Sequence, residues 1–248
     1  MKIFSVIGYT LTGKTTTIEN IIKELKNRGY TIGTIKEIHF EKFKMDKEGT
    51  NTYRHMESGP ELVTARGYYE TDILFPRQLS IDEILKFYTQ DYVIIEGAVD
   101  YKMPVILCAQ NEEEIRERLN ENVFVISGKI SDSLSEFNNI PVISGIKEIR
   151  LIVDLIEKKV YEKLPDYPPE CCSKCGYDCR TLGIRILKGL SKREDCVISK
   201  RNIVLKIDGK VIGMVPFVQD ILFDVVEAVV KNLQGYDRGK TIEIKMGE

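Results

Sequence analysis

The sequence predicts an α/β fold in which a mainly parallel β-sheet carries helices on both faces. The first observation is that short apolar runs alternate with amphipathic runs up to about Lys159. The second is a glycine-rich phosphate-binding pattern, Gly8–Thr15, that lies between the first apolar run and the first amphipathic run. Such alternation is typical of parallel strands, because each strand needs a helical crossover before the next strand can run in the same direction.

The elements follow from the spacing of the apolar residues. Buried strands are predicted at Ile3–Ile7, Thr31–Lys36, Tyr92–Glu96, Val105–Ala109 and Val123–Ile126. Helices are predicted at Thr15–Arg28, Ile81–Tyr88, Glu112–Leu119 and Ile146–Lys158. Two further runs, Glu61–Ala65 and Glu70–Leu74, flank Gly67 and predict a hairpin, which we expect at an antiparallel edge of a mixed sheet.

A stretch with three prolines, Leu164–Glu170, divides the chain into two predicted domains, 1–163 and 164–248. Proline cannot continue a helix and it stiffens the chain, so this stretch is typical of a domain boundary. The second domain is predicted to be a small α+β module. Its expected elements are a short helix at Thr181–Lys188, a hairpin at Ile203–Ile207 and Val211–Met214, and a helix with one buried apolar stripe at Val218–Leu233.

The segment Gly8-Tyr9-Thr10-Leu11-Thr12-Gly13-Lys14-Thr15 fits the loop pattern G-x-x-x-x-G-K-[ST], and Thr16 follows it. Backbone N–H groups must point inward to hold a phosphate chain, and the two glycines permit turns and a close approach that a side chain would block. Lys14 is expected to reach the outer phosphates, and Thr15 to offer its hydroxyl to Mg²⁺. We therefore expect this segment to bind a nucleoside triphosphate in a domain of the P-loop NTPase class.

Two carboxylates are candidates for the metal and for hydrolysis. Glu96 ends an apolar strand at the position where α/β sheets place their ligands, so we expect it to hold Mg²⁺ or its waters. Asp46 lies in the polar segment Lys44–Thr52, which as a loop would close over the γ-phosphate, with Asp46 as metal ligand or water-positioning group. The alternative for each is an ordinary carboxylate that faces water.

The base is predicted from the segment after the last strand. Ser127–Asp132 lies where many GTPases carry their guanine-reading loop. A carboxylate such as Asp132 accepts two hydrogen bonds, from N1–H and N2–H of guanine, which adenine does not offer. The sequence therefore favours GTP, with ATP as the alternative.

Five of the six cysteines fall between Cys171 and Cys196. In a reducing compartment such clustering favours a metal site over disulfides. The spacing Cys172-x2-Cys175-x3-Cys179-x16-Cys196 places three thiolates in one compact loop with a remote fourth, which suits a 4Fe-4S cluster. Structural zinc is the alternative, since four cysteines also satisfy a tetrahedral site. Cys171 is expected to be spare, and Cys108 to be a buried small hydrophobe.

The charge and hydropathy of the chain exclude some partners. The net charge of the 248 residues is −2, which indicates no general attraction to nucleic acid or to anionic membranes. No apolar stretch approaches the roughly 20 residues of a membrane-spanning helix, and Met1–Phe4 leads straight into the first strand. We expect a cytoplasmic protein.

The motifs follow the order found in the molybdopterin-guanine-dinucleotide biosynthesis protein B (MobB) family, which the chain resembles over residues 1 to about 160. The matching segments are Gly8–Thr17, Thr34–Lys36, Asp46–Arg54, Val93–Gly97 and Ser131-Asp132. The resemblance implies a homodimer that binds GTP with Mg²⁺, hydrolyses it weakly, and assists the guanylyltransferase that attaches GMP to molybdopterin. The cysteine segment is similar to small 4Fe-4S domains, and the fusion resembles archaeal MobB-like proteins.

Three functions are open at this point. The leading one is an accessory GTPase of molybdenum or tungsten cofactor maturation. The second is a redox-regulated metal-centre chaperone, in which nucleotide hydrolysis drives docking to an apo-molybdoenzyme. The third is a small-molecule kinase, which is disfavoured because Arg66, Arg77, Arg116 and Arg118 show no pattern of a basic lid.

Overall fold

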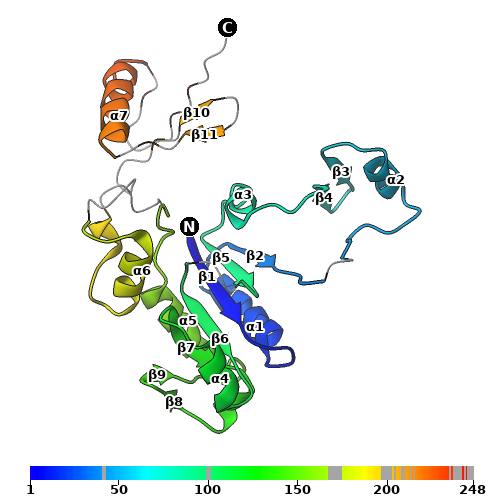
Figure 1. Cartoon of the computed structure of the whole chain (residues 1–248), viewed down its shortest axis with the longest axis vertical. Helices are drawn as coiled ribbons and strands as arrows, with labels where there is room; N and C mark the ends of the chain where they lie inside the picture. Colours follow the sequence, from blue (N-terminus) through cyan, green and yellow to red (C-terminus); the bar gives the residue numbers. More distant parts are fainter. Residues whose placement is uncertain are drawn as a thin grey trace. The chain divides into compact units, whose positions relative to one another are not determined.

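The computed structural model describes residues 1–40, 43–98, 102–166 and 175–196, together with 203, 205–207, 210–212, 214, 216–234, 236, 242 and 244. The chain forms two compact units, Met1–Val160 and Tyr161–Glu248. Figure 1 colours the first unit from blue to green and the second from yellow to red. Within the described residues, no helix has the length and apolarity that crossing a membrane requires.

The five expected strands form one parallel sheet in the first unit, and the predicted α/β class is confirmed. They are β1 (Lys2–Ile7), β2 (Ile32–Lys36), β5 (Tyr92–Glu96), β6 (Val105–Cys108) and β7 (Val123–Ser127), in the order β2-β5-β1-β6-β7. The connections after β1 and after β5 lead to opposite sides of β1. Ligands of α/β sheets bind beyond the carboxyl ends of strands at such a reversal, so the end of β1 is the expected binding position.

Helices cover both faces of this sheet (Figure 1). On one face, α3 (Ile81–Leu85) packs on Val93 and Ile95, and α4 (Glu112–Arg118) packs on the layer that contains Leu107. On the other face, α1 (Lys14–Asn27) contacts β1, β2 and β5, while α5 (Ile149–Lys159) contacts α1 and β7. Because the residues of the inner strands point alternately into two buried layers, β6 and the first four residues of β5 are continuous apolar runs, whereas β2, at the edge of the sheet, is mixed.

In the first unit, two helices fall short of their predicted bounds by three residues at one end. α5 begins at Ile149 and not at Ile146, because the Ser144 hydroxyl accepts the backbone N–H groups of Ile146 at 3.4 Å and Lys147 at 3.2 Å and holds a turn there. α3 ends at Leu85 and not at Tyr88, whose hydroxyl donates to the carbonyl of Thr34 in β2 at 2.7 Å. Between β7 and α5 lie η1 (Lys129–Asp132), β8 (Glu136–Phe137) and β9 (Ile140–Pro141).

Between β2 and α3 the chain forms α2 (Asn51–Glu57) and the antiparallel strands β3 (Val63–Arg66) and β4 (Thr71–Leu74). The predicted hairpin is confirmed, but its expected place at an edge of the main sheet is wrong, because β3 and β4 form a two-stranded sheet of their own (Figure 1). Val63 is the buried side chain of the two strands. The hairpin therefore has too few apolar side chains to join a sheet that is covered on both faces.

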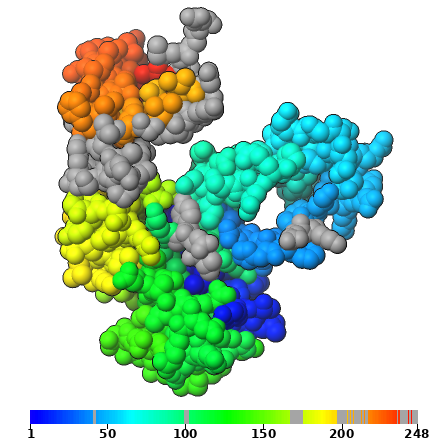
Figure 2. All heavy atoms as spheres, in the orientation of Figure 1, coloured from blue at the N-terminus to red at the C-terminus, as the bar shows by residue number. Residues whose placement is uncertain are grey.

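The second unit contains α6 (Cys179–Leu187), η2 (Arg193–Asp195), the hairpin of β10 (Leu205–Ile207) and β11 (Lys210–Ile212), and α7 (Pro216–Val230). The predicted burial of the apolar stripe on the last helix is wrong. Val218, Ile221 and Val225 are 42 %, 49 % and 57 % exposed, and α7 (orange in Figure 2) lies at the surface of this unit. The side of α7 that is buried is the one that carries Gln219, whose side chain is 3 % exposed. Several apolar residues of the helix lie outside this buried side and are exposed.

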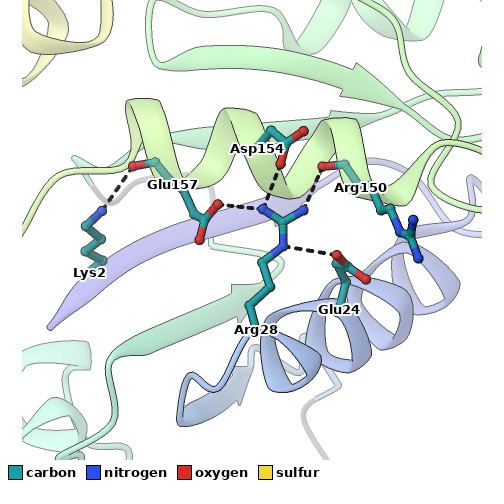
Figure 3. Close-up of polar contacts among 6 residues, drawn as sticks. All are labelled: Lys2, Glu24, Arg28, Arg150, Asp154 and Glu157. Atoms are coloured by element: carbon teal, nitrogen blue, oxygen red, sulfur yellow. Dashed lines mark hydrogen bonds and ion pairs between the residues drawn. The ribbon is translucent and has the colours of Figure 1, made fainter.

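Arg28 joins the end of α1 to α5 (Figure 3). Its guanidinium donates to Glu24 at 3.0 Å, to Asp154 at 2.7 Å, to Glu157, and to the carbonyl of Arg150 at 3.3 Å. The Arg28 side chain is 22 % exposed, so the network is partly shielded from water. These contacts fix the helix that begins in the phosphate-binding loop against the rest of the layer.

Replacement of Arg28 by alanine is expected to lower the free energy of unfolding by about 1–2 kcal/mol, because three carboxylates lose a shared, partly shielded partner. Arg28→Lys is the control, since it keeps the charge but cannot donate in several directions, and should recover part of the loss. The measurement is urea denaturation of the full chain followed by circular dichroism. Equal midpoints for wild type and Arg28→Ala would show that the network is unimportant for stability.

Candidate functional site

The predicted phosphate-binding loop joins the end of β1 to the start of α1. Gly8 has φ of +149° and Gly13 has φ of +96°, and Leu11 also has a positive φ of 64°. A Cβ atom on Gly8 would lie 2.1 Å from the carbonyl oxygen of Cys108 in β6. Gly8 is therefore required because the loop backbone passes directly over the neighbouring strand.

The loop rests on the ends of β6 and β7. Thr12 is buried and its hydroxyl donates to the Tyr9 carbonyl at 2.9 Å. A Cβ atom on Gly128 would lie 2.4 Å from the carbonyl oxygen of Thr12 and 2.8 Å from that of Ala109. Sequence reasoning missed the role of Gly128, for which the signal is a glycine directly after the last buried strand.

Lys14 and Tyr9 are linked within the loop. The Lys14 ammonium donates to the backbone carbonyl of Tyr9. The Tyr9 hydroxyl donates to Glu117 at 2.6 Å, and the guanidinium carbon of Arg118 lies 4.0 Å from the centre of the Tyr9 ring. Both partners belong to α4, so this helix holds the loop in place through Tyr9, the residue that follows the first glycine of the pattern. The sequence carries no local signal for this contact, because the residues lie about a hundred positions apart.

The predicted metal residues Thr15 and Glu96 come together in the structure. The hydroxyl of Thr15 lies 3.4 Å from Glu96 Oε1, and Lys36 Nζ lies 3.1 Å from the same oxygen. β2 and β5 are paired so that Lys36 and Glu96 are register partners at the strand ends. Lys36 was not among the predicted site residues, although a lysine at the end of a strand beside that of Glu96 was a usable signal.

The predicted base-reading residue Asp132 ends η1, which follows Gly128 directly. Its carboxylate accepts a hydrogen bond from Lys147 at 2.8 Å, and both side chains are exposed. Asp132 and Lys147 both lie on segments that follow β7, which is the neighbour of β6 in the sheet. The role of Asp132 in base recognition stays a prediction.

Asp46 has local partners. Its Oδ1 atom accepts the Lys47 N–H at 2.9 Å and the Thr50 hydroxyl at 2.8 Å, and Thr50 in turn caps α2. Hydrogen bonds from Thr50 and Thr52 hold the pKa of Asp46 below its usual range. These contacts make Asp46 part of the turn that starts α2, and its predicted role in hydrolysis stays a prediction.

Three of the four predicted cluster ligands belong to one small group of packed side chains. Cys196 is buried with Leu164 and Leu182, and Cys175 and Cys179 pack against them. Cys175 Sγ lies 3.2 Å from the carbonyl oxygen of Tyr177. Among the residues that the structure describes, no group of three or more His, Cys, Asp or Glu side chains is arranged to hold a metal ion. Cys172 and the spare Cys171 lie outside the described residues.

The parallel sheet, the loop between β1 and α1, and the carboxylate at the end of the adjacent β5 define the first unit as a nucleotide-binding domain of the P-loop class. Residues 3–128 match the model of the family Molybdopterin guanine dinucleotide synthesis protein B (MobB). A relative is 31 % identical to this chain over 99 % of the length of this chain. The chain therefore belongs to the MobB family.

That relative comes from Methanocaldococcus jannaschii, carries the provisional name of a molybdopterin-guanine dinucleotide biosynthesis adapter protein, and is covered over 97 % of its length. A molybdopterin-guanine dinucleotide biosynthesis adapter protein from Haemophilus influenzae is 28 % identical over 60 % of this chain and 88 % of its own. The crystal structure of Bacillus subtilis MobB matches with a TM-score of 0.56 and 20 % identity, over 66 % of this chain and 100 % of that one. That likeness concerns the fold.

Proposed function

We propose that this chain binds GTP with Mg²⁺ and acts as an accessory protein, with weak GTPase activity, in the guanine-dinucleotide step of molybdenum or tungsten cofactor biosynthesis. The observation that carries the proposal is the meeting of Thr15 and Glu96, 3.4 Å apart, at the end of the glycine loop. The relatives described above are named as adapter proteins of that biosynthesis, in the M. jannaschii case provisionally, and this supports the same step for this chain.

The residues present fit a magnesium triphosphate. Gly8 and Gly128 leave no room for side chains where the loop packs, so the loop backbone is held close to the ends of β6 and β7. Backbone N–H groups of a loop of this kind are the donors that hold a phosphate chain. Lys14 supplies a flexible cation at the first residue of α1, where the helix dipole is positive. The Thr15 hydroxyl and the Glu96 carboxylate are oxygen donors of the kind Mg²⁺ prefers.

We propose that guanine is read by Asp132. GTP should then bind at least about tenfold more tightly than ATP, or about 1.4 kcal/mol, because adenine lacks the paired N1–H and N2–H donors that guanine offers to the carboxylate. Calorimetric titration of wild type and of Asp132→Ala measures this, with Glu136→Ala as the matched control on an exposed acid nearby. Equal affinities of the wild type for the two nucleotides would exclude the guanine assignment.

The accessory role implies a protein partner. We propose that a molybdopterin guanylyltransferase binds this chain, that binding depends on GTP, and that the chain acts as a homodimer. Co-elution of the two purified proteins with GTP, GDP or no nucleotide tests the proposal. Co-elution that is unaffected by nucleotide, or no co-elution at all, would contradict it. The alternative role in docking to an apo-molybdoenzyme is tested in the same way with that enzyme.

We also propose that Cys172, Cys175, Cys179 and Cys196 bind a 4Fe-4S cluster, with structural Zn²⁺ as the alternative. The packing of the last three around Leu164 and Leu182 supports a common site. Cys179 is the first residue of α6, where the helix dipole stabilises a thiolate. The M. jannaschii relative aligns over 99 % of this chain, so an archaeal type of MobB with this module is proposed.

A further inference from the structure

Lys36 contacts a residue of the proposed metal site directly. Its ammonium lies 3.1 Å from Glu96 Oε1, the same oxygen that lies 3.4 Å from the Thr15 hydroxyl. One carboxylate oxygen therefore joins a cation from β2 to the hydroxyl at the start of α1. The sheet brings the two residues together, because Lys36 and Glu96 are register partners on adjacent parallel strands.

The two side chains of the pair differ in their exposure to solvent. The Glu96 side chain is 15 % exposed, whereas the Lys36 side chain is 58 % exposed. Glu96 is thus held in place at the strand end, while the lysine stem is free to take other rotamers. An exposed lysine of this kind adds little to stability, and its worth as a surface ion pair is typically below about 1 kcal/mol. The position of Lys36 beside the carboxylate of the proposed metal site therefore indicates a role in ligand binding more than a role in stability.

Charge counting shows what a cation at this position would do. A nucleoside triphosphate carries about one negative charge more than a diphosphate near neutral pH. Mg²⁺ and Lys14 supply the same positive charge to both nucleotides, and Glu96 adds a negative charge beside the metal. A third cation at the end of β2 would therefore favour the triphosphate, whose outer phosphate lies on the metal side of the loop.

The distances allow this contact. Mg²⁺ holds its oxygen ligands at about 2.0–2.1 Å in octahedral geometry, so neighbouring ligands of one ion lie about 3 Å apart. A phosphate oxygen that shares an ion with Glu96 would thus lie about as far from this carboxylate as the Lys36 ammonium lies from Oε1. The Lys36 side chain is 58 % exposed, so its stem has room to rotate from the carboxylate toward such an oxygen.

We propose that Lys36 is a γ-phosphate-binding residue. Without nucleotide its ammonium contacts Glu96. When Mg²⁺ binds with the triphosphate and becomes the partner of Glu96, the ammonium moves to the outer phosphate. Lys36 then distinguishes GTP from GDP, and couples the end of β2, and the segment that follows it, to the nucleotide state. This inference rests on the proposed function, since it requires that the loop bind a nucleotide.

The test is calorimetric titration of GTP and GDP, each with Mg²⁺, into the full chain and its variants. Lys36→Met should weaken GTP binding about tenfold or more and change GDP binding less than about threefold, because one charge-assisted contact to the outer phosphate is lost. Lys36→Arg should keep most of the preference for GTP. Lys23→Met, on an exposed lysine of α1, is the matched control and should leave both affinities unchanged.

The outcomes separate this inference from the function on which it rests. A wild type that binds both nucleotides, together with a Lys36→Met variant that has the same ratio of GTP to GDP affinity, would overturn the role of Lys36 alone. A wild type that binds neither nucleotide would overturn the proposed function as well. Circular dichroism of each variant checks that lost binding is not lost folding, and Lys36→Gln supplies a second neutral variant.

Discussion

Lys14→Ala is expected to abolish detectable triphosphate binding while the fold is retained. The Lys14 ammonium donates to the Tyr9 carbonyl within the loop, so its charge already lies where a phosphate chain would be bound. Loss of a cation that faces several phosphate oxygens removes charge-assisted hydrogen bonds that the rest of the loop cannot replace. The fold should remain, because Lys14 belongs to neither face of the buried core.

The measurement is calorimetric titration with GTP and Mg²⁺, accompanied by circular dichroism and thermal unfolding. Lys26→Ala is the matched control, since this lysine is exposed in the last turn of the same helix. It should bind like the wild type. If Lys14→Ala bound GTP with unchanged affinity, the loop would not be the phosphate site and the proposed function would lose its basis.

Replacement of any one of Cys172, Cys175, Cys179 and Cys196 by serine is expected to cause loss of iron from protein made anaerobically. Wild type should be brown, absorb in a broad shoulder near about 400 nm, and carry close to four irons per chain, as four cysteine ligands imply. Without the cluster the second unit should be digested faster by protease, because a short chain segment with few buried side chains depends on ligation for stability.

Cys108 supplies the control. It is 1 % exposed in β6, far from the cysteine segment in sequence, and burial raises the pKa of its thiol to about 12. Its thiol therefore stays protonated near neutral pH and is a poor ligand, so Cys108→Ser should keep its iron, as should Cys171→Ser. Stoichiometric zinc without iron would make the site structural zinc. An intact second unit after removal of two ligands would contradict a metal-dependent fold.

The main sheet and the phosphate loop were predictable because their signals are local. β1 and β5 are buried on both faces, so β5 is a run of apolar residues up to Glu96, and β1 is apolar from Ile3 to Ile7 except at Ser5. Gly8, Gly13 and Lys14 belong to a pattern that lies within eight consecutive residues, so it is visible in the sequence. The turn at Ser144 and the start of α2 were harder to predict from the sequence, because they depend on side-chain hydrogen bonds to a few N–H groups.

Other features come from contacts between distant parts of the chain. The pairing of β2 with β5 puts Lys36 on Glu96, and the packing of α4 puts Glu117 and Arg118 on Tyr9. Neither pair has a recognisable spacing, because partners on adjacent strands or helices can be separated by any length of chain. The exposed face of α7 is a similar case, since periodicity predicts an amphipathic helix but not whether its apolar face is covered. Local patterns are thus sufficient for the strands of the main sheet and for the nucleotide loop. The partners of Glu96 and Tyr9 and the separate β3–β4 sheet arise only when the chain has folded, because strand order and helix packing decide which distant side chains meet.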